Sequence, residues 1–367
     1  MLHEISILKD SYKDSVRLLE ATRSMQSDER VDYGFAVMAS EANVETLTSE
    51  GFSGLAGASA NDLVLAVRSV DQEVVDAALE AARSALFSVT SGDGDGVDPS
   101  VQSLRQAIDV QPDTNVAIIS VPGPYATLET HKALTAGLDV LLFSDNVPLA
   151  DEIELKQRAR ELGRLVMGPG AGTAMLAGTG LGFANRVNSG PVGIIAAAGT
   201  GAQEVMSLLD RWGIGITHVI GLGGRDLNAE VGGLMAESAI EALEADEQTQ
   251  VILFVSKPPA PEVAQRLLGT SRSKPMVAAM IGLRDELVGL ADGVSVCNTL
   301  EQGAALTAGI LGHPVPDLVG PTAEAVATAM TPLAQERRRL VGLFSGGTLC
   351  YEAMTIATEH IGAIHSN

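Results

Sequence analysis

Short apolar runs alternate with amphipathic stretches along most of the chain, a pattern typical of strands that alternate with helices. Three such pairs are predicted at the start, with strands at 5–8, 34–38 and 63–67 and helices at 11–23, 43–48 and 72–86. This repeat predicts a small α/β domain over residues 1–90, the first of several successive parallel-sheet domains.

A break in the pattern follows at residues 91–100 (SGDGDGVDPS), where glycine, aspartate and proline leave little to bury and predict a linker. The alternation then restarts, with strands at 115–120, 140–144 and 165–167 and helices at 125–135 and 149–162. We therefore expect a Rossmann-like domain over residues 101–187.

The next set of strands is predicted at 192–196, 216–220, 251–255, 275–280 and 294–297, with helices at 202–212 and 231–245 between them. Each strand is a continuous apolar run, as a parallel sheet covered on both faces requires. The prediction is a flavodoxin-like domain over residues 188–314, with right-handed crossovers that place its loops at one edge.

The last segment, residues 315–367, contains a predicted strand at 340–344 and a predicted helix at 349–359. This arrangement is typical of the opening of a further α/β domain. We expect that domain to be incomplete here or to be completed by a partner chain.

Composition agrees with an α/β fold, because 46% hydrophobic residues with 3% aromatics and 39 glycines predict an aliphatic core with many tight turns. The net charge of −22 repels nucleic acid and anionic membranes, so a small anion needs a local positive site. The charged start of the chain and the lack of a spanning apolar run predict a cytoplasmic protein. Two distant cysteines and no paired histidine motif predict neither disulfides nor a metal site.

Three turns between a strand and a helix, at residues 197–201, 221–224 and 345–348, carry the candidate chemistry. Glycine lets the backbone approach an anion, and the free N–H groups at a helix start attract negative charge. Either these turns bind a phosphate-like anion or they are tight turns alone, since none matches a Walker A motif. The predicted phosphate-binding residues are Gly199, Thr200, Gly201, Gly346, Gly347 and Thr348.

Two basic residues follow strands at the edge where open sheets bind ligands. Lys257 comes directly after strand 251–255, and Arg225 follows the Gly223–Gly224 pair. Each is a candidate for orienting a substrate or phosphate. The alternatives are a solvated loop lysine and an arginine that pins its own loop.

Residues 190–201 (GPVGIIAAAGTG) and 220–224 (IGLGG) resemble the ligase domain of succinyl-CoA synthetase α subunits. The turns at 121–124 (VPGP) and 167–170 (MGPG) resemble the second half of their CoA-binding domain. Over nearly the whole chain, including 343–352 (LFSGGTLCYE), the sequence resembles the FdrA family of acyl-CoA synthetase-like proteins. The resemblance implies a CoA-binding-type domain at 101–187, a ligase-type domain at 188–314 and the start of a second ligase-type domain at 315–367.

The resemblance also implies a function. Members of this family act with other subunits in an oxamate carbamoyltransferase-like complex of allantoin and purine catabolism. That complex transfers a carbamoyl group between oxalurate and phosphate, giving carbamoyl phosphate and oxamate. By this resemblance the helix after Gly201 and the helix at Gly347–Thr348 point at one phosphate, and Gly123, Gly223 and Gly224 contact the substrate. An oligomer with other subunits is expected.

Two departures from the synthetases keep alternatives open. The phosphohistidine loop expected after residues 276–281 is missing, and residues 1–34 lack the glycine-rich CoA fingerprint. Phosphate or carbamoyl phosphate is therefore the expected ligand, and a CoA site is not assigned. The alternatives are an acyl-CoA ligase that uses CoA and nucleotide, and a non-catalytic scaffold subunit.

Overall fold

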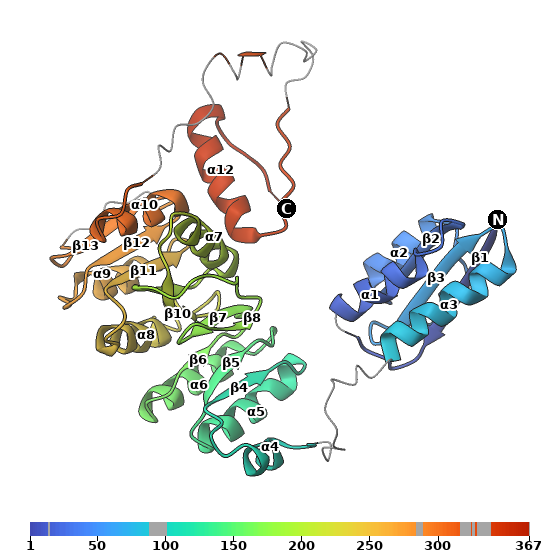
Figure 1. The fold of residues 1–367 in the computed structure, drawn as a ribbon, viewed down its shortest axis with the longest axis horizontal. Coiled ribbons are helices and arrows are strands. Elements are labelled where there is room, and N and C mark those ends of the chain that lie inside the picture. Colours follow the sequence, from blue (N-terminus) through green and yellow to red (C-terminus); the bar gives the residue numbers. More distant parts are fainter. Residues whose placement is uncertain are drawn as a thin grey trace. The chain divides into compact units, whose positions relative to one another are not determined.

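The computed structural model describes residues 1–13, 15–87, 101–283, 289–315, 324, 327–328 and 339–366. The chain divides into two compact units, Met1–Pro99 and Ser100–Asn367, each of which is described by itself (Figure 1). The linker predicted at 91–100 lies outside the described residues.

The N-terminal unit contains the three predicted strand–helix pairs. Its elements are β1 (Leu2–Leu8), α1 (Ser15–Met25), β2 (Val31–Met38), α2 (Glu41–Ser49), β3 (Leu63–Ser69) and α3 (Gln72–Phe87). The sheet order is β1-β3-β2, and β3 pairs antiparallel with both neighbours. The expectation of parallel sheets throughout was therefore wrong for this unit, because β3 runs back between β1 and β2 as in a split βαβ motif.

Helices cover both faces of this sheet. Buried residues of α1 and α3, among them Met25 and Val75, pack on one face around Leu65. On the other face Leu47 of α2 and Phe52 pack against Val64. Successive residues of β3 thus point into opposite cores, which explains why this strand is apolar along its length.

The second unit begins with a small parallel sheet of order β4-β5-β6. Its elements are α4 (Leu104–Val110), β4 (Val116–Ile119), α5 (Gly123–Thr135), β5 (Asp139–Leu142), α6 (Leu149–Glu161) and β6 (Val166–Met167). The predicted strands and helices of this region are confirmed, and the loops that follow the three strands share one edge.

A seven-stranded sheet follows, with the order β13-β12-β11-β9-β10-β7-β8. Its elements are β7 (Thr173–Leu176), β8 (Thr179–Gly182), β9 (Val192–Ala196), α7 (Gly199–Arg211), β10 (Ile216–Gly221), α8 (Leu234–Ala245), β11 (Val251–Ser256), α9 (Pro261–Gly269), β12 (Met276–Met280), β13 (Val294–Cys297) and α10 (Leu300–Ile310). From β9 to β13 all pairs are parallel, and this order is the flavodoxin-like one, as predicted.

The hairpin β7–β8 was not predicted. It lies inside the range expected for the preceding Rossmann-like domain, yet β7 pairs antiparallel with β10 of the larger sheet. Residues of α7 and α10 form the core on one face of this sheet, and residues of α8 and α9 form it on the other. Every residue of β11 is buried between these layers.

The C-terminal part contains α12 (Gly347–Ile361), which packs against α7. The strand predicted at 340–344 is not formed, since these described residues have no sheet partner for their N–H and C=O groups. Most of 316–338 lies outside the described residues. Among the described helices, none combines the length and apolarity needed to cross a bilayer.

Candidate anion-binding site

A cavity of about 320 Å³ lies where loops at the carboxyl edges of the two parallel sheets meet the start of α12. Its walls come from 170–173 after β6, 196–200 after β9, 221 and 223–224 after β10, Lys257 after β11, and 347–348 in α12. Five segments that are distant in the sequence thus surround one space. Nearly all of the lining residues are glycine, alanine or threonine, so a ligand can approach the backbone closely.

The sheet order places this cavity at a topological switch point. Strands β9 and β11 are neighbours, and the connection from β9 leads to β10 on one side while the connection from β11 leads to β12 on the other. In open α/β sheets the crevice at such a point is where ligands bind. The loop after β9 and Lys257 after β11 flank this crevice.

Two helices begin at the cavity without a side-chain cap. Helix α7 starts at Gly199 after the N-cap Ala198, and α12 starts at Gly347 after the N-cap Gly346. Alanine and glycine carry no acceptor for the first N–H groups of a helix. These N–H groups and the two helix dipoles therefore supply positive potential where the helices meet.

Close packing holds the two helix starts together. A Cβ atom on Gly201 would lie 2.9 Å from Cγ2 of Thr348, and one on Gly346 would lie 2.9 Å from Cγ2 of Thr200. Glycine at both positions is thus required for this approach. Farther along α12, Glu352 Oε1 accepts a hydrogen bond of 2.7 Å from the Leu300 N–H at the start of α10. Burial, with smaller effects from nearby glutamates, raises the pKa of Glu352.

Lys257 is the one charged side chain among the described residues that line the cavity. It is exposed, and its Nζ lies 5.9 Å from the ring centroid of Tyr351 on α12. Its charge supplies the local positive site that an anion needs in a chain of net charge −22. Lys257 therefore lies beside the glycine turns at the edge of the sheet that follows β11.

The Gly223–Gly224 pair forms the wall that follows β10. Gly223 has φ +78°, and a Cβ atom there would lie 2.5 Å from the carbonyl oxygen of Pro169. This glycine lets the loop after β10 lie against the loop after β6. Gly224 also lines the cavity and has open space where a Cβ would stand.

Two predicted site residues lie elsewhere. Arg225 Nε forms an ion pair of 2.8 Å with Glu152, and an Nη donates to the Val147 carbonyl oxygen at 2.7 Å. This arginine pins its loop to the start of α6, which was the alternative left open for it. Gly123 begins α5, where a Cβ would lie 2.5 Å from the Asp145 carbonyl oxygen, so it serves close packing.

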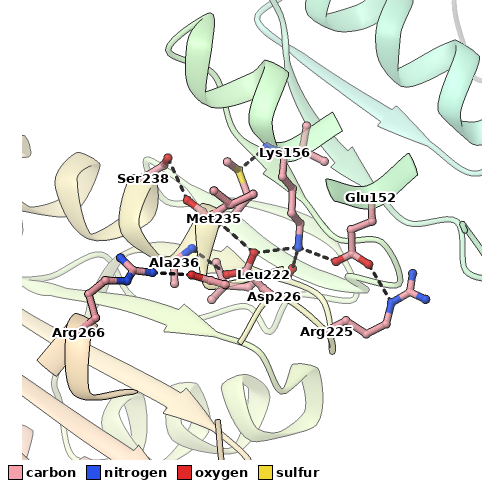
Figure 2. A network of polar contacts seen from close by, with 12 residues as sticks. Glu152, Lys156, Leu222, Arg225, Asp226, Met235, Ala236, Ser238 and Arg266 are labelled. Atoms are coloured by element: carbon pink, nitrogen blue, oxygen red, sulfur yellow. Dashed lines mark hydrogen bonds and ion pairs between the residues drawn. The ribbon is translucent and has the colours of Figure 1, made fainter. Parts of the chain in front are cut away.

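A buried ion network behind the cavity was missed from the sequence. Glu152 and Lys156 on α6 meet Asp226 after β10, and all three side chains are fully buried (Figure 2). The sequence does contain a pattern that indicates this network. The buried face of α6 has the spacing i, i+3, i+4, i+7 and consists of Glu152, Leu155, Lys156 and Ala159. A charged pair within an apolar stripe indicates a buried partner.

The chemistry available to the cavity is electrostatic. Backbone N–H groups and one ammonium group hold a phosphoryl-sized anion and stabilise negative charge that develops on it. Apart from Lys257, the described lining offers no titratable side chain. The site therefore suits a ligand that brings its own reactive group.

Two protein families match parts of this chain. The CoA binding domain family matches residues 187–280, which contain β9–β12 of the larger sheet and lie one domain later than the CoA-binding-type domain expected from the sequence. The family described as the AllF heavy metal-associated domain matches residues 1–100. The resemblance to CoA ligase α subunits and the α/β fold class are confirmed at this level.

Three curated relatives cover most or half of the chain. The uncharacterized protein YahF of Escherichia coli is 35% identical over 99% of this chain and 71% of its own. The ADP-forming sulfoacetate-CoA ligase subunit SauD of Bilophila wadsworthia is 30% identical over 54% of this chain and 70% of its own. The succinate–CoA ligase [ADP-forming] subunit alpha 2 of Archaeoglobus fulgidus is 29% identical over 50% of this chain, which spans 64% of that relative.

The heavy-metal family raises the question of a metal site. Both cysteines, Cys297 and Cys350, lie outside residues 1–100. Within the described residues no three histidine, cysteine, aspartate or glutamate side chains gather in a way that would hold an ion. The described residues of the N-terminal unit thus include neither a cysteine nor a cluster of ligands that fits a heavy metal.

Proposed function

We propose that this chain, which belongs to the family of CoA ligase-like proteins that includes YahF and SauD, is the subunit of an acyl-CoA ligase that holds the phosphoryl group of an acyl phosphate. The observation that carries the proposal is the cavity in which the starts of α7 and α12 and Lys257 converge. Partner subunits supply the rest of the active complex, as the subunit names of the relatives suggest.

The proposed reaction uses the cavity as an anion holder. The CoA thiol attacks the carbonyl carbon of the acyl phosphate, a C–S bond forms, and the bond to the phosphate oxygen breaks. The leaving phosphate takes the electron pair and the thiol proton. Backbone N–H groups of Gly199–Thr200 and Gly347–Thr348, with Lys257, stabilise the charge that gathers on this phosphate.

The test is formation of a CoA thioester from CoA and an acyl phosphate. Acetyl phosphate and succinyl phosphate are supplied to the chain alone and to the chain produced together with the proteins encoded beside it. Thioester is quantified by mass spectrometry. We expect activity that depends on the cavity, so Lys257→Met should lower it about tenfold, the effect of losing one hydrogen bond to a charged group.

The matched control is Lys132→Met. Lys132 is an exposed lysine on α5 that pairs with Glu129 outside the cavity. Its replacement changes the net charge equally and should leave activity unchanged. Equal activity of the Lys257→Met and Lys132→Met proteins would contradict the assigned site, and no thioester from any well-assembled complex would contradict the ligase proposal.

A second candidate, carbamoyl transfer in an FdrA-type complex, is favoured by one observation. No histidine is present among the described residues that line the cavity, so the lining offers no phosphohistidine. Carbamoyl phosphate is itself an acyl phosphate and would occupy the same donors. Phosphate-dependent formation of carbamoyl phosphate from oxalurate, without CoA, would establish this candidate over the ligase.

A further inference from the structure

Lys156 is an unusual residue, because its side chain is fully buried on α6 behind the cavity. An ammonium group removed from water is stable only when its charge and all three N–H donors are satisfied. Nζ donates to Glu152 Oε1 at 2.8 Å, to Asp226 Oδ1 at 2.9 Å and to the Leu222 carbonyl oxygen at 3.1 Å (Figure 2). All three donors are therefore used.

The partners of Lys156 are held in turn. Asp226 accepts from the N–H groups of Met235 at 3.1 Å and Ala236 at 2.9 Å, so it caps α8, whose own N-cap is Gly233. Glu152 is paired on its other oxygen with Arg225. Two cations and two carboxylates thus form a neutral network that joins α6, the loop after β10 and α8.

Leu222 connects this network to the cavity wall. It stands between Gly221 and Gly223, both of which line the cavity. Its N–H donates to the Ala196 carbonyl oxygen at 2.8 Å, and its own carbonyl oxygen accepts from Lys156. The main chain of the wall is thereby held from both sides, by the end of β9 and by the buried ammonium.

The geometry of the peptide between Leu222 and Gly223 links the Lys156 hydrogen bond to the orientation of the Gly223 N–H. In a trans peptide the carbonyl oxygen of one residue and the N–H of the next point in opposite directions within one plane. Because Lys156 draws the Leu222 carbonyl oxygen toward the buried network, the Gly223 N–H is turned away from that network. Within the described part of the chain this N–H has no hydrogen-bond acceptor of its own.

We propose that Lys156 is a positioning residue for the anion cavity, which it serves by aiming the Gly223 N–H at the bound anion through the Leu222 peptide. This inference rests on the proposed anion-binding function. Lys156 does not touch the anion, and its charge is already neutralised by Glu152 and Asp226.

A buried ion network contributes little stability compared with apolar residues of similar volume, whereas removing one member alone leaves uncompensated charge. The test therefore uses a charge-matched pair, Lys156→Met with Asp226→Asn, beside the single Lys156→Met. The double variant keeps the net charge of the chain and lacks the donor to Leu222. If the single variant fails to fold, the double variant carries the comparison.

Three measurements separate positioning from a structural role. Calorimetric titration with inorganic phosphate gives affinity, amide NMR reports the Gly223 resonance with and without phosphate, and thermal unfolding reports the fold. We expect the folded double variant to bind phosphate at least about tenfold more weakly and to show a displaced Gly223 resonance even without phosphate. The charge-matched control is Lys132→Met with Glu129→Gln, which removes an exposed pair of α5 outside the network, and it should bind within about twofold of the natural chain.

A folded double variant with natural phosphate affinity and an unmoved Gly223 resonance would overturn the inference. The proposed function fails separately, if the natural chain itself binds neither phosphate nor acyl phosphate. In that case the Gly223 resonance of the ligand-free double variant still decides whether Lys156 sets this peptide.

Discussion

The start of α12 offers the sharpest test of the anion cavity, through Gly347→Asp. A Cβ atom on Gly347 meets nothing closer than Lys257 Nζ at 3.9 Å, so a side chain fits without moving the backbone. The new carboxylate would stand at the helix start, close to Lys257 and in the space proposed for the anion. Acidic residues in the first turn stabilise helices slightly, so folding should be unaffected.

The expected loss follows from charge repulsion. Two unit charges about 5 Å apart interact by about 3 kcal/mol at an effective dielectric constant of about 20. Side-chain freedom and screening lower this figure, so we expect a loss of about 2–3 kcal/mol, or roughly 30- to 140-fold in affinity. Pairing of the new carboxylate with Lys257 also lowers the phosphate affinity, because it occupies the ammonium group that would contact the anion.

Calorimetric titration with inorganic phosphate at constant ionic strength measures this effect. Gly347→Asn is the matched control, because it adds a side chain of the same shape without charge and should lose less than about tenfold. Thermal unfolding of both variants checks the fold. Equal phosphate affinity of the natural, Gly347→Asp and Gly347→Asn proteins, with equal melting temperatures, would refute the placement of the anion.

Two further predictions concern titrating groups outside the cavity. Burial raises the pKa of the Cys297 thiol to about 11. Iodoacetamide at pH 8 should therefore label Cys350 and spare Cys297, and the labelling of Cys297 should rise with pH. Equal labelling of both cysteines by mass spectrometry would contradict this. Hydrogen bonds from Lys9 and from backbone N–H groups hold the pKa of Asp62 far below its usual value of 3.8, so its contribution to stability is present at neutral pH and is lost as the pH falls below that value. Asp62→Asn should lower the melting temperature of the N-terminal unit at pH 7 and weaken its acid dependence; calorimetry that finds both unchanged would count against this role.

The order of the parallel strands β9–β13 was predictable from the sequence because these strands are continuous apolar runs, most of them separated by helices, and few arrangements satisfy right-handed crossovers. The N-terminal sheet was not, since the same alternation of strand and helix fits both a parallel sheet and a split βαβ unit. The direction of β3 depends on how the chain returns after α2, where Leu47 and Phe52 pack against Val64 of β3, and the sequence pattern does not reveal these contacts.

The hairpin β7–β8 was missed because its sequence, TAMLAGTGLG, is rich in glycine and alanine and lacks a clear alternation. The turn is formed by Ala177 and Gly178, both with positive φ, and a two-residue loop of this kind is typical of hairpins. Within the candidate site, the glycine turns and Lys257 were predicted only from their positions directly after predicted strands. The role of Arg225 depended on Glu152, which is 73 residues away in the sequence and could not be paired with it beforehand.

The hairpin also determines how the chain tolerates insertions and deletions. Strand β7 follows directly on the loop after β6, and its neighbours Ala174 and Met175 point into the cores on opposite faces of the larger sheet. A single residue added or removed between β6 and β7 would exchange these two side chains, placing methionine where alanine fits and leaving a void on the other side. In this family, therefore, the length of the β6–β7 connection should be as restricted as any residue in the cavity.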